Sequence, residues 1–181
     1  MDEAAFARLV SLACHDLRTP LATIVGFART LTRTTGLDDQ QQRWIGLIDE
    51  AAVELDGLID LLSIAARVEG GRFSPERGAV GVADLAPGVE SDVAVITDRT
   101  AASIALAALL RAAERHGKPQ TPMWRMRDAQ LLLGPLTAQA AAVLSGSEER
   151  DLGALVARRV LDALDATISI DGEDLAVAFP R

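Results

Sequence analysis

The sequence contains almost no cysteine. Cys14 is the only one in 181 residues, which excludes a disulfide within the chain and fits a reducing compartment. With one cysteine and two histidines, the chain offers no recognisable ligand spacing for zinc. We therefore expect no intrachain disulfide and no bound metal ion.

Lysine and runs of positive charge are also scarce. Of the 18 lysines and arginines only Lys118 is a lysine, and the formal net charge is −8 at pH 7. Nucleic acids and anionic membranes bind clusters of basic residues. We therefore expect neither a nucleic acid nor a membrane as a partner.

No apolar run is long enough to cross a bilayer. The longest, at residues 104–110, is far shorter than the roughly 18 residues that a membrane-spanning helix needs. The acidic N-terminus has no continuous apolar core, which predicts the absence of a signal peptide. Only 14 residues precede His15, so we expect no sensory domain ahead of it and a cytoplasmic location.

Apolar residues nevertheless make up 49% of the chain, which is enough for one large or two small folded domains. Apolar residues at steps of three and four predict an amphipathic helix from about residue 2 to residue 33. Its stripe comprises Phe6, Val10, Ala13, Leu17, Leu21, Ile24, Ala28 and Leu31. His15 lies two positions from Ala13 and from Leu17, a rotation of about 200° from each. The imidazole should therefore face water.

A second helix is expected to begin after Asp38, because Asp38 and Gln41 have the spacing of a capping box. It should end at Gly70 and Gly71. Its stripe comprises Trp44, Ile45, Ile48, Ala52, Leu55, Ile59, Leu62 and Ala66. Two such helices joined by a short loop form an antiparallel hairpin, which leaves part of each apolar stripe exposed to solvent. Pairing with a second copy in a four-helix bundle would cover it.

The exposed His15 could carry chemistry. A neutral imidazole is nucleophilic near pH 7, so it can accept and return a phosphoryl group. Asp16 could orient or deprotonate the ring, Thr19 could position a water, and Pro20 should bend the helix. A lone exposed histidine is more often a solvated surface residue, so the surrounding residues decide between the two interpretations.

Residues 15–21 read His-Asp-Leu-Arg-Thr-Pro-Leu and resemble the phosphoacceptor box of sensor histidine kinases at every position. The resemblance implies that His15 is phosphorylated, that Asp16 is its acid/base partner, and that Thr19 assists dephosphorylation of a receiver domain. The receiver should dock on the helix surface around these residues, where small side chains permit close approach. The partner-binding residues expected there are Arg18, Ala22, Thr23 and Gly26.

The predicted fold is α+β, with a helical hairpin domain at 1–71, a linker at 72–78 and a small α/β sandwich at 79–181. The linker is rich in Arg, Ser, Pro, Glu and Gly. The pattern beyond it predicts a sheet with helices on one face. Strands are expected at 92–97, 123–133 (one or two), 167–170 and 175–179, and helices at 98–115, 137–144 and 151–164.

The second region resembles the ATP-binding domain of histidine kinases, but the residues that hold magnesium and the nucleotide in that family are replaced. Ala108 and Ala112 stand at the two asparagine positions of the family's asparagine box, and alanine has no oxygen to coordinate magnesium. Asp151 replaces the first glycine of the family's Gly-Leu-Gly-Leu segment, of which only Gly153 remains. A carboxylate there caps the helix and repels a triphosphate. The resemblance therefore implies that this chain binds no nucleotide cofactor.

An intact phosphoacceptor helix followed by a degenerate ATPase-like domain resembles dimeric histidine phosphotransferases of the ChpT type. It implies a homodimer that shuttles a phosphoryl group between receiver-domain aspartates in a two-component phosphorelay. The enzyme would be a phosphotransferase with a phosphohistidine intermediate at His15, and the receiver would supply Mg²⁺. Two alternatives stay open. One is a diverged kinase that still uses ATP, and the other is a non-catalytic dimeric adaptor that sequesters a response regulator.

Overall fold

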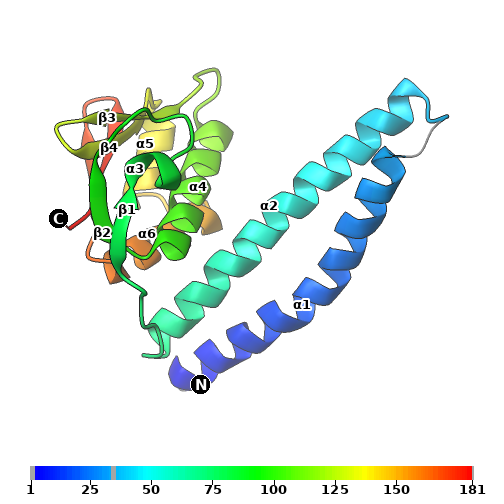
Figure 1. Cartoon of the computed structure of the whole chain (residues 1–181), viewed down its shortest axis with the longest axis horizontal. Helices are drawn as coiled ribbons and strands as arrows, with labels where there is room; N and C mark the ends of the chain where they lie inside the picture. The colour runs from blue at the N-terminus through cyan, green and yellow to red at the C-terminus, as the bar shows by residue number, and fades with distance from the viewer. Residues whose placement is uncertain (1–2, 34–35, 181) are drawn as a thin grey trace. The chain divides into compact units, whose positions relative to one another are not determined.

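A computed structural model describes residues 3–33 and 36–180 of the chain. The chain separates into two compact units, Met1–Gly70 and Gly71–Arg181 (Figure 1). The expected start of the first helix at residue 2, and most of the break expected at 34–36, lie outside the described residues.

The first unit is a hairpin of two long helices, α1 (Glu3–Thr32) and α2 (Asp39–Glu69), as the sequence predicts. The capping box is formed: the Asp38 side chain accepts from the Gln41 backbone N–H at 2.8 Å, and the Gln41 side chain accepts from the Asp38 N–H at 3.1 Å. Gly70 caps the other end of α2. In the part of the chain that the structure describes, no helix is long and apolar enough to span a membrane.

Helix α1 continues through Pro20 without a break, and its axis curves along its length in Figure 1. Proline has no N–H to donate to the preceding turn, so the helix loses one backbone hydrogen bond and bends more easily there. The bend expected beyond His15 is therefore accommodated within one continuous helix.

The two helices pack through residues spaced seven apart, which is the repeat of antiparallel coiled coils. This heptad layer comprises Ala7, Cys14, Leu21 and Ala28 of α1 and Ile45, Ala52, Ile59 and Ala66 of α2, each less than 9% exposed. Cys14, Leu21, Ala52 and Ile59 form one continuous cluster at its centre. The layer fixes how each helix is rotated about its own axis.

The structure divides each predicted stripe into two. The heptad layer is buried within the hairpin, whereas a second set of large apolar side chains is left exposed. We call this set the apolar face: Leu17, Ile24 and Leu31 of α1 and Trp44, Ile48 and Leu55 of α2. Ala13, which the sequence places on the stripe, is exposed, and the side chain of Phe6 lies outside the described part of the chain.

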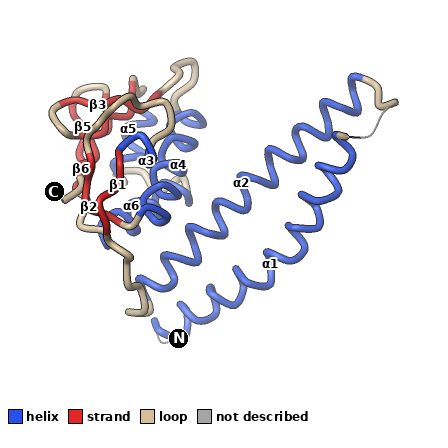
Figure 2. Tube along the Cα trace, in the orientation of Figure 1, coloured by secondary structure: helices blue, strands red, loops and turns tan. Residues whose placement is uncertain are grey.

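The second unit has two antiparallel sheets and four helices among its described residues. Its elements in chain order are β1 (Gly78–Gly81), α3 (Val82–Leu85), β2 (Ala94–Thr97), α4 (Arg99–His116), β3 (Met123–Arg127), β4 (Gln130–Gly134), α5 (Ala138–Ser145), α6 (Leu152–Ala163), β5 (Thr167–Asp171) and β6 (Asp174–Ala178). Strands β1 and β2 pair with each other, and the larger sheet has the order β3-β4-β6-β5. Helices α4, α5 and α6 lie on one side of the strands (Figure 2).

The α+β prediction is confirmed, with two differences in detail and one open alternative, one or two strands at 123–133, decided in favour of two. The sequence analysis places no element at β1 or α3, each of which is four residues long. The 123–133 segment is a hairpin, β3 and β4, turned by two residues with positive φ, Asp128 and Ala129. Gly78, assigned to the linker from the sequence, begins β1.

Candidate functional site

His15 projects from α1 into solvent, as the rotation argument predicts. Its side chain is 79% exposed and that of Asp16 is 70% exposed, and Nδ1 of the ring lies 3.1 Å from Oδ1 of Asp16. A neutral ring that donates from Nδ1 to the carboxylate keeps the lone pair of Nε2 free to attack an electrophile. The arrangement is suited to accepting a phosphoryl group on Nε2.

Cys14 does not take part in this chemistry. It belongs to the heptad layer and is only 2% exposed. Burial raises the pKa of the Cys14 thiol, and the positive charge of Arg18 opposes this only in part. A protonated, buried thiol is a poor nucleophile. The exposed His15 is thus the candidate nucleophile in this part of α1.

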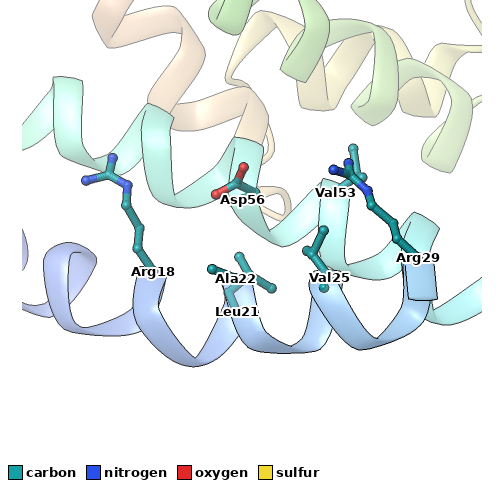
Figure 3. Close-up of a pocket in the computed structure, with 8 residues that line it drawn as sticks. Arg18, Leu21, Ala22, Val25, Arg29, Val53 and Asp56 are labelled. Carbon is teal, nitrogen blue, oxygen red and sulfur yellow. The ribbon is translucent and has the colours of Figure 1, made fainter. Parts of the chain in front are cut away.

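A groove of about 440 Å³ lies between α1 and α2. Along α1 its lining begins at Arg18, three residues after His15. Its lining consists of Arg18, Leu21, Ala22, Val25, Gly26 and Arg29 from α1 and Val53 and Asp56 from α2. Figure 3 shows the α1 side chains opposite Val53 and Asp56. Two ion pairs join the helices here: Arg18 to Asp60 at 2.7 Å and Arg29 to Asp49 at 3.7 Å.

Three of the four expected partner-binding residues, Arg18, Ala22 and Gly26, line this groove. Gly26 faces open space, since an added Cβ would have no neighbour within 4 Å. The fourth, Thr23, does not line it, and its hydroxyl donates to the Thr19 carbonyl at 3.2 Å. Thr19 is exposed.

Sequence reasoning missed the α2 wall of the groove. Val53 and Asp56 face the α1 residues, but which α2 residues do so depends on the register between the helices. Local sequence patterns do not encode that register. The recurrence of Ile45, Ala52 and Ile59 every seven residues was the available signal, because it defines the packed side of α2 and hence its flanks.

Three of the positions that the sequence analysis compares with nucleotide ligands belong to the core of the second unit. Ala108 is 2% exposed, Ala112 is 0% exposed, and Gly153 is buried. Their side chains hold no oxygen or nitrogen that could ligate a metal or a phosphate. Among the described residues, no group of three or more His, Cys, Asp or Glu side chains is arranged to hold a metal ion. At these three positions no side chain can ligate magnesium or a phosphate.

Asp151 lies where the ends of α4 and α6 meet. One carboxylate oxygen, Oδ2, accepts from Nε and Nη2 of Arg115 at 3.0 and 2.9 Å and lies 3.0 Å from Nε2 of His116. The other, Oδ1, accepts from the Ala154 N–H at 2.9 Å and so caps α6. The cap is expected from the sequence, whereas the pairing with Arg115 and His116 is not. We call these three side chains the helix-end junction.

The Asp151 side chain is only 4% exposed. Burial alone would raise its pKa, but hydrogen bonds from the Ala154 N–H and from the side chains of Arg115 and His116 outweigh this and hold the pKa below its ordinary value. The carboxylate is therefore ionised at neutral pH and is stabilised in the folded state by its partners.

Comparison with known proteins identifies the hairpin. Residues 7–71 match the family model of the His Kinase A (phospho-acceptor) domain. The hairpin is therefore similar to a His Kinase A domain over nearly its whole length. Over 71 residues the chain is also 31% identical to the sensor protein DivL of Caulobacter vibrioides, an alignment that covers 39% of this chain and 9% of DivL.

Solved structures extend the similarity to the second unit at the level of fold. Full-length ShkA in complex with AMPPNP aligns with 94% of this chain and 44% of its own, with a TM-score of 0.54 and 17% identity. The histidine kinase AdeS of Acinetobacter baumannii aligns with 92% of this chain and 97% of its own, with a TM-score of 0.50 and 18% identity. The hairpin is thus similar in sequence to the His Kinase A domain, and the chain as a whole is similar in fold to these histidine kinase structures.

The lowered pKa of Asp151 predicts acid-sensitive stability in the second unit. Because the pKa of Asp151 is lower in the folded than in the unfolded chain, its ionised carboxylate stabilises the fold. This stabilisation is fully present at pH values above the unfolded pKa, about 3.8, and is lost as the pH falls through the folded pKa. We expect Asp151→Asn to lower the free energy of unfolding by about 2 kcal/mol at pH 7. Urea titrations should show this deficit shrinking below pH 4, whereas a deficit independent of pH would contradict the assignment.

Proposed function

We propose that this chain is a histidine phosphotransferase of a two-component phosphorelay, which passes a phosphoryl group between receiver-domain aspartates through His15 and does not use ATP. One observation carries the proposal. A complete phosphoacceptor box presents His15 to solvent with Nδ1 held by Asp16, while the degenerate positions of the second unit are buried alanine and an ion-paired carboxylate.

The transfer follows from the geometry of the ring. Nε2 of His15 attacks the phosphorus of a receiver aspartyl phosphate in line, the N–P bond forms, and the P–O bond breaks with its electron pair leaving on the aspartate. The phosphorylated ring is cationic and keeps its Nδ1 proton, which the Asp16 carboxylate stabilises. Transfer to a second receiver reverses these steps, with the receiver's own Mg²⁺ neutralising phosphoryl charge.

The groove supports docking of the receiver beside His15. Ala22 and Gly26 on α1 carry little or no side chain, so a partner backbone can approach closely, and Arg18 offers a cation at the near end. Asp60 holds that guanidinium at 2.7 Å, which pre-orients it. Docking on this side places the receiver against both helices of the hairpin.

The apolar face supports a homodimer. Leu17, Ile24 and Leu31 follow the heptad residues by three positions, which places them about 60° to one side of the buried layer. His15 follows Cys14 by one position and lies about 100° to the other side. Two hairpins can therefore bury their apolar faces in a four-helix bundle while both imidazoles stay accessible.

The proposed relay acts in the cytoplasm, in line with a free, buried Cys14 as the only cysteine. The whole-chain similarity in fold to ShkA in complex with AMPPNP favours one rival, a diverged kinase that still uses ATP. The other rival, a non-catalytic adaptor, would bind a receiver and never carry phosphate.

We expect label to pass from a phosphorylated receiver to this protein and on to a second receiver, followed on gels that preserve phosphohistidine. His15→Ala should abolish labelling without unfolding the chain, because the residue is exposed. Asp16→Asn should slow transfer by about 10²-fold, the usual effect of a lost acid/base group. Thr19→Ala should spare transfer and reduce receiver dephosphorylation.

His116→Gln is the matched control, since His116 is the chain's other histidine. Its label should equal that of the wild type. Label retained by His15→Ala would refute the phosphoacceptor assignment, and a wild type that binds receivers but is never labelled would establish the adaptor.

The apolar face predicts a dimer in light scattering at micromolar concentration. Ile24→Glu should shift the mass toward the monomer, because a charge would be buried in the bundle. Thr23→Glu adds the same charge at an exposed neighbouring position outside the apolar face, and it should leave the mass unchanged. A wild-type protein that is monomeric at this concentration would contradict the proposed four-helix bundle.

We expect no ATP binding at millimolar nucleotide with magnesium, measured by isothermal titration calorimetry. Buried alanine at 108 and 112 supplies no ligand for the metal, and the Asp151 carboxylate repels the phosphates. Saturable heats, or phosphate appearing on His15 from ATP alone, would favour the kinase over the relay protein.

A further inference from the structure

The two edge strands of the larger sheet, β3 and β5, differ in how they are protected. An exposed sheet edge can pair with a further strand, and proteins usually prevent this with charged side chains or proline. Strand β3 carries Arg125 and Arg127. Strand β5 contains no proline and no basic residue, and its one charged residue, Asp171, lies at its last position. The sequence of β5 therefore leaves its edge available to an added strand.

The pairing of β5 with β6 shows which backbone groups lie on that edge. Asp171 and Asp174 flank a two-residue turn and form the closing pair of the hairpin, so the backbone groups of Asp171 point toward β6. Because the direction alternates along a strand, Ser169 also bonds to β6, whereas the N–H and C=O of Ile168 and Ile170 point away from it. Among the residues that the structure describes, no further backbone group bonds to these two.

A pocket of about 580 Å³ adjoins the same edge, between β5 and α6. Its lining comprises Leu155, Arg158, Arg159, Asp162, Ala166, Thr167 and Ile168. Two guanidinium groups and one carboxylate give the pocket a positive local charge. The Arg158 side chain is anchored, since its Nη1 donates to the Leu144 carbonyl at 2.9 Å. Apolar and cationic side chains thus lie next to backbone donors and acceptors.

We propose that the β5 edge and this pocket bind an extended, acidic segment of a partner protein, which adds a strand to the sheet. A residue of the segment opposite Ile168 points to the same face as Ile168, and so toward the pocket. The next residue on that face is two positions along the segment. An apolar side chain at one of these positions would pack on Leu155, and a carboxylate at the other would pair with the guanidinium groups.

A second copy of this chain fits the edge less well. A strand of five residues buries far less than the roughly 1,000 Å² that a stable interface between folded proteins needs. A second β5 would also bring only one carboxylate, that of Asp171, which is already paired with Arg127. An extended segment needs less area, because main-chain hydrogen bonds supply its affinity and the pocket its specificity.

The probe for this site is a synthetic peptide, Thr-Val-Thr-Glu-Thr-Val-Thr with blocked ends, titrated into the full isotope-labelled chain. The readout is amide hydrogen exchange followed by NMR. In the unbound chain the N–H groups of Ile168 and Ile170 should exchange rapidly, and saturating peptide should slow them by about tenfold or more. The N–H of Ser169 already bonds to β6, so its exchange should change little.

Ile170→Pro is the blocking variant. It removes only an N–H that points away from β6, so the β5–β6 ladder is kept, and it should weaken peptide binding by about tenfold or more. Ile170→Val is the matched control, because it keeps both the N–H and a branched side chain, and it should bind like the wild type. A peptide with lysine in place of glutamate should bind the wild type more weakly and Arg159→Glu more tightly.

If Ile170→Pro does not fold, a peptide N-methylated at its valine and glutamate residues tests the same hydrogen bonds from the other side, and it should not bind. No protection at millimolar peptide, or equal binding by the blocking and control variants, would overturn the proposal. A particle mass that falls in Ile170→Pro would show that a second copy occupies the edge instead. The site goes beyond the proposed function, and its test involves neither a receiver nor His15, so the failure of one leaves the other unaffected.

Discussion

The packing of Cys14, Leu21, Ala52 and Ile59 between the two helices determines what the rest of the hairpin can do. Residues spaced seven apart keep one side of each helix facing its partner along the whole length. That contact fixes the rotation of α1, and the rotation sets which side chains face solvent. His15 is presented on one flank and the apolar face on the other because the residues between them are buried.

In the second unit, two alanines of α4 and the side chain of Asp151 contribute to stability. Ala108 and Ala112 belong to the buried side of α4, and Asp151 caps α6 and pairs with the partly exposed Arg115. A polar pocket for a metal-bound ligand costs stability when it is empty, since its donors stay unpaired. Small apolar side chains and an internal ion pair remove that cost.

Features encoded within one helix could be predicted from the sequence. The capping box of Asp38 and Gln41 and the exposure of His15 both depend on local spacing alone, and both are found. Contacts between distant segments could not be predicted. Whether Val53 faces α1 depends on interhelical register, and the pairing of Asp151 with Arg115 joins residues 36 positions apart. The division of each stripe into a buried and an exposed set could not be predicted either, because leucine and isoleucine occur in both sets.

The proposed function assigns different roles to the two flanks of α1. Leu17 and Ile24 lie on the apolar face, whereas Ala22 and Gly26 line the groove. Under the proposed function, a duplicated gene with substitutions on the first flank would stop exchanging subunits with its parent and still recognise the same receiver. Substitutions on the second flank would change the receiver and leave subunit exchange intact. In that proposal, paralogous pathways become insulated one property at a time through a single helix.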